Sequence, residues 1–152
     1  MIAHRGYCTA LTVIIWTLLF LAMPATVVAA GEASIGLGYT ERSIAFKEYE
    51  ADRNSDGEIR YLIKLIKFSN MRVVKAGQEF SASQAARYLL MKFKTAKSKI
   101  VSAEQFIDDF ASYAPDGEPI YIIDRKGMNY PARHVLYGEL RRLRNLGSAN
   151  FR

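Results

Sequence analysis

Asp52, Asn54 and Asp56 form the clearest metal-ligating pattern in the chain, because they stand at alternate positions and are followed by Gly57. An EF-hand loop places oxygen ligands at alternate positions, turns sharply at a glycine and closes on a bidentate glutamate. In this chain the closing position is occupied by Ile63, which has no ligand atom to offer. The pattern therefore predicts at most a weak calcium site.

The same stretch favours the start of a helix. Ser55-x-x-Glu58 has the spacing of a capping box, and Asp56 and Glu58 would lie in a first turn, where the helix dipole attracts acidic side chains. Arg60 adds a cation where the calcium loop would need another ligand. We therefore expect a helix that begins at Ser55, with the calcium site as the alternative, and we expect no cofactor.

Acidic side chains could also support glycan cleavage, a reaction that uses two carboxyl groups. Glu104 and Asp108 are four residues apart and share one face of an expected helix, so Glu104 is a weak candidate for a general acid. A solvated acidic face, or an ion pair between Glu104 and the lysines of residues 92–99, explains them without catalysis. His134 is the only histidine after residue 30, which favours a structural role for it. The sequence thus favours a protein that is not an enzyme.

Residues 1–30 have the layout of a secretory signal peptide. Arg5 supplies the positive charge, an apolar run follows, and small residues close the segment. The alternative is an inner-membrane anchor formed by residues 9–30. Cys8 is the only cysteine and would be removed with the signal peptide, so the exported domain would contain no disulfide. We expect an exported, periplasmic protein.

The charge distribution suggests an anionic neighbour. Without residues 1–30, which hold Arg5 and no acidic residue, the 21 Lys/Arg fall to 20 against 15 Asp/Glu, a net charge of +5. Residues 59–100 alone hold 10 basic side chains and 1 acidic one. Such a segment needs either the acidic segments of the same chain or an external partner. The candidate contact residues are Arg72, Lys75, Lys92, Arg141, Arg142 and Arg144.

The expected partners are an anionic polymer of the cell envelope, a lipid headgroup or an acidic protein. Nucleic acid is excluded by export, and the membrane enters only through an uncleaved anchor.

Local patterns predict the elements that position these residues. Apolar side chains recur at helical spacing from Ser55 to about Ser69, and Gly77 marks the turn of a hairpin formed by residues 72–75 and 78–80. Two capping boxes, Ser81-x-x-Gln84 and Ser102-x-x-Gln105, open the next two helices. The second of these helices carries the clearest apolar stripe, formed by Ala103, Phe106, Ile107, Phe110 and Ala111.

The C-terminal third reads as a strand, a turn and a return strand over residues 120–130, followed by a last helix. The core side of that helix is formed by Val135, Leu136, Leu140 and Leu143, and Arg141, Arg142 and Arg144 are expected on its outer face. Residues 41–51 stay open between a helix and a loosely docked arm.

Several segments resemble the small exported bacterial family of unknown function typified by YfeK. They are "EIRYLI" at 58–63, "VVKAGQEF" at 73–80, residues 85–92, and "SAEQFI" at 102–107, within a match of about residues 58–144. The resemblance implies export and an α+β fold, and it implies no activity because none is established for the family.

The chain departs from the family pattern at three places. Lys75-Ala76 replaces Arg-Asn, Tyr88 replaces a histidine, and Tyr113-Ala114-Pro115 replaces a run of serines. If those polar groups bind a common ligand in the family, this chain has changed or lost it.

Together these observations predict an α+β domain of about four helices packed on a small antiparallel sheet. The expected organisation is a signal peptide at 1–30, a linker or loosely packed arm at 31–54, a single domain at 55–146 and a tail at 147–152. The leading function is a non-catalytic exported module that binds an anionic component of the cell envelope. The alternatives are an enzyme acting on envelope glycan and a purely structural or protein-interaction domain.

Overall fold

The computed structural model describes residues 39–149, so the expected signal peptide, residues 31–38 of the expected linker or arm, and the last three residues lie outside the described residues. Between residues 39 and 149, no helix combines the length and the apolar character that crossing a membrane requires.

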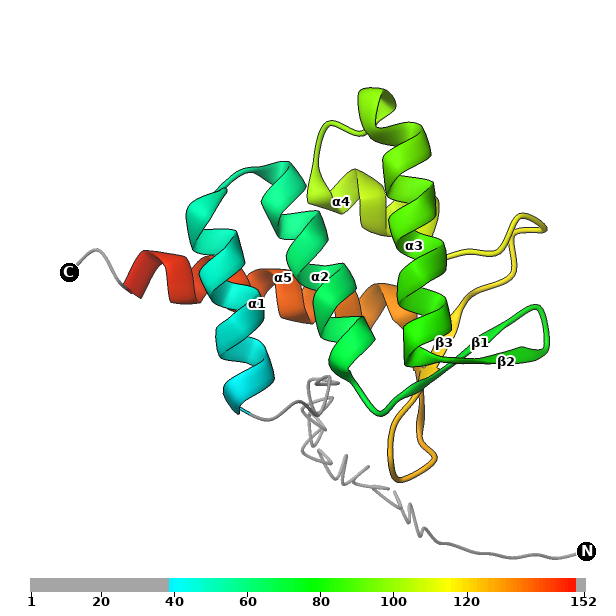
Figure 1. Ribbon diagram of the computed structural model, residues 1–152. Helices are drawn as coiled ribbons and strands as arrows, with labels where there is room; N and C mark the ends of the chain where they lie inside the picture. The colour runs from blue at the N-terminus through cyan, green and yellow to red at the C-terminus, as the bar shows by residue number, and fades with distance from the viewer. Residues whose placement is uncertain (1–38, 150–152) are drawn as a thin grey trace, which may run out of the picture. The chain divides into compact units, whose positions relative to one another are not determined.

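The described part is α+β, with five α-helices and one four-stranded antiparallel sheet of order β2-β1-β3-β4 (Figure 1). The helices are α1 (Tyr39–Ala51), α2 (Ser55–Phe68), α3 (Ala82–Ala96), α4 (Ala103–Phe106) and α5 (Ala132–Ala149). The strands are β1 (Arg72–Lys75), β2 (Gln78–Ser81), β3 (Tyr121–Ile123) and β4 (Asn129–Pro131). A 3₁₀ turn, η1 (Lys97–Lys99), follows α3, and a π-helical turn, η2 (Ile107–Ala111), continues α4.

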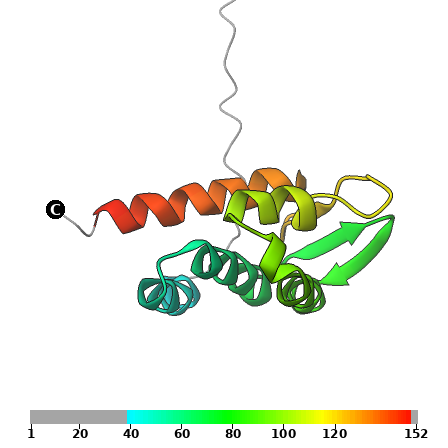
Figure 2. The ribbon, with the colours of Figure 1, turned by 90° about the horizontal axis from the view of Figure 1, so that it is seen from above.

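The helices pack in two layers. Helices α1, α2 and α3 lie in a row, and α5 crosses behind them (Figure 1), with α4 beside α5 in the second layer (Figure 2). The core between the layers is apolar, and its largest fully buried side chains include Ile59, Leu65, Phe106, Leu136 and Leu140. Four of these residues, Ile59, Phe106, Leu136 and Leu140, belong to the apolar stripes that the sequence predicts for α2, α4 and α5.

Helix α2 begins at Ser55, as the sequence predicts, but its cap is one residue earlier. The side chain of Asn54 accepts a hydrogen bond from the Gly57 main-chain N–H at 2.9 Å, so Asn54 is the N-cap and Ser55 is already helical. The expected capping box of Ser55 and Glu58 is therefore wrong. Glu58 instead lies buried against helix α5.

The 72–80 hairpin is confirmed. Ala76 and Gly77 both have positive φ angles, 48° and 70°, which is the backbone of a tight type I′ turn. Val73 is paired with Phe80 on one side and with Ile122 on the other, so all three face the helices. Lys75 shares that face because side chains on a strand alternate. The hairpin thereby carries Lys75 to α3.

Helix α1 corrects the expected helix count from four to five. The segment that the sequence left open is helical, and Ala45 is only 1% exposed against the core while its neighbour Ile44 is 47% exposed. A guanidinium–carboxylate contact from Arg42 to Glu139 joins α1 to α5. These contacts join residues that are far apart in the sequence, so no local sequence pattern predicts them.

The helix expected from Ser102 onward changes its winding. Ser102 caps α4 as predicted, by accepting a hydrogen bond from the Gln105 main-chain N–H at 3.1 Å. After Phe106 the chain widens into η2, and the Ser112 hydroxyl donates to the Ile107 carbonyl at 2.6 Å. Four residues of the predicted apolar stripe are buried and Phe110 is half-buried, so the stripe still faces the core despite the wider turn.

Candidate ligand-binding pocket

An apolar pocket lies between the sheet, α3 and α5. Its volume is about 310 Å³. The sheet contributes Val73 and Ile122, α3 contributes Ala85 and Leu89, and α5 contributes Leu136. A recess lined in this way favours the apolar part of a ligand, and its size lies near the lower end of the range of about 300–1,000 Å³ for small-molecule sites.

Polar side chains gather on the solvent side of this pocket. Gln84 is exposed, and Lys75 and Tyr88 are half-buried, whereas most of the apolar lining is buried. The Lys75 ammonium donates a hydrogen bond to the Tyr88 hydroxyl at 3.0 Å, and its Nζ lies 4.2 Å from the centre of the Tyr88 ring. A lysine that contacts a tyrosine hydroxyl and ring therefore lies at the opening of the pocket.

A second lysine approaches the same ring. The Lys92 Nζ lies 4.8 Å from the Tyr88 ring centre and donates a hydrogen bond to the Phe110 carbonyl at 3.1 Å. The hydrogen bond from Lys75, with a smaller contribution from Lys92, lowers the pKa of Tyr88 against the opposing effect of burial. Hydrogen bonds from lysine favour the negative form of a phenol, so the surroundings of the Tyr88 hydroxyl stabilise negative charge.

The structure therefore brings Lys75 and Lys92 together and separates them from the other four candidate cations. In the region with described side chains, residues 42–148, these two lysines contact a phenol ring and a main-chain carbonyl. Arg72 instead pairs across the hairpin with Glu79, at 2.9 and 3.0 Å. Arg141 lies on another surface, in a groove beside α5.

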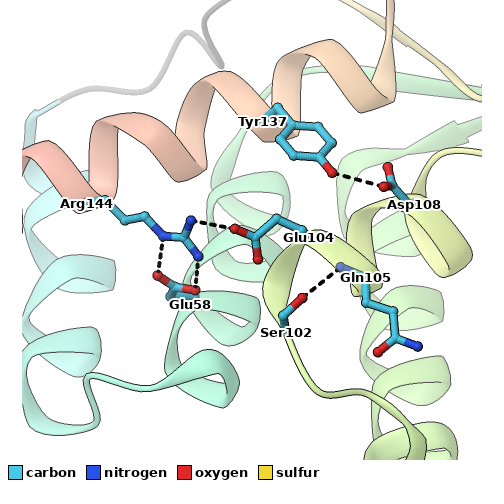
Figure 3. Close-up of polar contacts among 7 residues, drawn as sticks. All are labelled: Glu58, Ser102, Glu104, Gln105, Asp108, Tyr137 and Arg144. Atoms are coloured by element: carbon cyan, nitrogen blue, oxygen red, sulfur yellow. Dashed lines mark hydrogen bonds and ion pairs between the residues drawn. The ribbon is translucent and has the colours of Figure 1, made fainter.

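The sequence predicts that Arg142 and Arg144 face outward. In the structure, both of them contact acidic side chains of the same chain. Arg142 donates to Glu139, whose side chain is fully buried, at 3.0 Å. Arg144 reaches back to Glu58 on α2 with hydrogen bonds of 2.7 and 2.9 Å, and it also contacts Glu104 on α4 (Figure 3). Both arginines balance acidic groups of the same chain, and a contact with a ligand stays a prediction for them.

The two acids considered for catalysis are held in ion pairs. Glu104 pairs with Arg144 and not with the lysines of residues 92–99, so that expected pairing is wrong. The hydrogen bond from Arg144 lowers the pKa of Glu104, whereas a glycosidase acid needs a raised pKa. Asp108 accepts a hydrogen bond from Arg133 at 2.8 Å, which lowers its pKa. It also accepts one from the Tyr137 hydroxyl at 3.0 Å, which Figure 3 shows.

The residues of the calcium-like loop also have protein partners. Asp52 is ion-paired with Arg60, the residue that the sequence analysis identified as a misplaced cation. Asp56 pairs with Lys97 at 2.7 Å, and Asn54 caps α2. Across the described residues, no group of three His, Cys, Asp or Glu side chains is placed to hold a metal ion.

The structure explains why position 57 in this loop is a glycine. It lacks the positive φ angle that sharp-turn glycines have, and a Cβ at this position would stand 1.8 Å from the Asp52 carbonyl oxygen. Close packing, and not a ligand loop, therefore requires the glycine.

Sequence reasoning identified Lys75 and Lys92 but missed Tyr88 and the pocket itself. The available signal was the comparison with the family pattern, since Lys75 and Tyr88 stand at two of the three places where the chain departs from it. The structure shows that these two departures contact each other.

The described part is thus a small α+β domain with an apolar pocket whose rim is cationic. The chain belongs to the family of unknown function DUF5329, whose model matches residues 53–144. That range includes every residue of the pocket. No curated protein and no solved structure matches this chain.

Proposed function

We propose that this domain is a non-catalytic module that binds a small molecule with an apolar body and one anionic head. The observation that carries the proposal is the hydrogen bond from Lys75 to Tyr88, because both residues line the apolar pocket. Lys92 lies over the same tyrosine ring but outside the pocket lining. The apolar body of the ligand fills the space beside Leu89 and Leu136. Its anionic head replaces the Tyr88 ring as the partner of the lysine ammonium groups.

The energetics of such a ligand divide between its two parts. Burying apolar surface supplies most of the affinity, at about 25 cal/mol per Å². The head supplies selectivity, because it replaces a phenol with a full negative charge as the partner of Lys75. Both lysines remain partly accessible to water, so the head contribution weakens as ionic strength rises.

Export to the periplasm and kinship with the family typified by YfeK are further parts of the proposal, supported by the character of residues 1–30 and by the quoted segments. In that compartment the ligand class includes anionic lipids and their acyl fragments, which are components of the cell envelope. An enzyme acting on glycan is less well supported, because Arg144 keeps Glu104 ionised.

Calorimetric titration of the protein with dodecanoate tests the proposal. Dodecyl phosphate serves as a second head and dodecanol as the uncharged match. We expect dodecanoate to bind and dodecanol to bind about tenfold more weakly, which is a difference of about 1.4 kcal/mol. Lys75→Ala should remove that preference, and Ala85→Phe, which fills the pocket, should abolish binding of all three compounds.

The matched control is Lys94→Ala. Lys94 is an exposed lysine of the same helix as Lys92 and does not line the pocket, so its removal should leave the affinity unchanged. Equal binding of dodecanoate and dodecanol, or an equal loss in Lys94→Ala and Lys75→Ala, would contradict recognition of the head. No binding of any compound would contradict the proposal as a whole.

A further inference from the structure

A second recess of about 580 Å³ lies on the opposite face of β3. Side chains alternate along a strand, so Ile122 lines the apolar pocket while Tyr121 faces this recess. Tyr113, Tyr121 and Tyr137 line it, and we call it the tyrosine groove.

Two of its tyrosines lie against prolines. Tyr121 is paired with Pro131 in the register of β3 and β4, and Tyr113 forms an isolated bridge with Pro119. Tyr113 is 43% exposed and Tyr121 is 38% exposed, so parts of their rings stay open to solvent. The floor of the groove therefore offers flat apolar surfaces edged by hydroxyl groups.

Helix α5 forms a wall of the groove. Arg133, Tyr137 and Arg141 are four residues apart and so lie on one face of the helix, over a length of about 12 Å. His134 is exposed beside them. Asp108 holds this wall in place by accepting hydrogen bonds from Arg133 and from the Tyr137 hydroxyl (Figure 3 shows the second).

This combination selects for an extended ligand with apolar ring faces, many hydroxyl groups and widely spaced negative charges. We propose that the tyrosine groove binds a strand of acidic polysaccharide. The sugar rings lie against Tyr113 and Tyr121, and their carboxylates are directed toward Arg133 and Arg141. The site is separate from the apolar pocket, because the two lie on opposite faces of β3.

Other polymers match the groove less well. Single-stranded nucleic acid needs a dense row of cations along its backbone, whereas the lining of this groove contains two arginines, Arg133 and Arg141, that are eight residues apart. A peptide strand needs main-chain donors, and Pro119 and Pro131 have none to give. Charge and hydrogen-bonding capacity thus favour the acidic glycan over both.

Titration of the protein with short oligogalacturonates tests this site. Their methyl esters serve as the uncharged match, and single-stranded DNA and a proline-rich acidic peptide represent the other polymers. We expect Tyr121→Ala and Arg141→Ala each to weaken oligogalacturonate binding about tenfold, through the lost ring contact and the lost charge. Melting curves check that both variants fold, and Arg141→Ala still tests the site if Tyr121→Ala does not fold.

Arg125→Ala is the matched control, because Arg125 is an exposed cation in the turn between β3 and β4 that does not line the groove. Its affinity for oligogalacturonate should be unchanged, and so should that of the pocket variant Lys75→Ala. An equal loss in Arg125→Ala, tighter binding of the DNA or the peptide, or no binding of oligogalacturonate would overturn the proposal.

Discussion

Two regions of this domain use basic side chains in opposite ways. Where α1, α2 and α5 meet, arginines are paired with carboxylates that are buried or nearly so, as in Arg42–Glu139 and Arg144–Glu58. Beside α3 and the sheet, Lys75 and Lys92 rest on the ring of Tyr88 instead. One region uses arginines and the other uses lysines, and the two sets of cations also differ in what they contact.

The two kinds of contact differ in how much free energy it costs to disrupt them. A buried carboxylate with guanidinium partners is expensive to disrupt, because removing one partner leaves a charge without compensation. A lysine on a phenol ring can exchange that contact for a stronger one with an anion. The arginine clusters therefore hold the helices together, and the lysine pair is the one to which we assign ligand binding in our proposal.

The largest expected effect comes from Glu139→Ala. Glu139 is fully buried and accepts hydrogen bonds from Arg42 and Arg142, so its loss should lower the free energy of unfolding by about 3 kcal/mol. Lys75→Ala should change it by less than about 1 kcal/mol. Urea unfolding measures both, with the exposed carboxylate variant Glu118→Ala as the control. Similar losses of unfolding free energy for Glu139→Ala and Lys75→Ala would contradict the difference between the two regions.

A smaller effect is expected from Gly57→Ala, on the arginine side of the molecule. The added Cβ would collide with the Asp52 carbonyl oxygen, which should cost about 2 kcal/mol of unfolding free energy. Gly147→Ala in α5 meets nothing within 4 Å and should be neutral or slightly stabilising. A tolerated Gly57→Ala, seen in the same urea experiment, would argue against the tight helix start described for Asn54 to Gly57.

Local signals in the sequence predicted much of the fold. Gly77 marked the hairpin and Ser81 marked the start of α3, because turns and caps depend on a few neighbouring residues. Helix α1 was left open because a contact 97 residues away in the sequence, from Arg42 to Glu139, helps to hold it. The π-helical turn after Phe106 was missed because the apolar stripe is buried with either winding.

The candidate site was predicted only in part for the same reason. Composition and charge identified Lys75 and Lys92 as candidate contacts, but they also identified Arg72, Arg142 and Arg144, which pair with carboxylates in the fold. Only the tertiary structure decides which basic side chains meet a carboxylate. The pocket is likewise assembled from β1, β3, α3 and α5, so no single segment of the sequence contains it.

The central claim is that the Lys75–Tyr88 contact is where the anionic head binds, and the titration of Tyr88 tests it most directly. The phenolate signal of Tyr88 is obtained by subtracting the absorbance titration of Tyr88→Phe from that of the unaltered protein, with and without dodecanoate. Without ligand, the pKa of Tyr88 should lie below that of an ordinary tyrosine, because Lys75 stabilises the phenolate. With ligand, it should rise, because the carboxylate draws Lys75 away and adds a negative charge beside the ring. A Tyr88 pKa that dodecanoate leaves unchanged, in a protein that binds dodecanoate, would contradict the account.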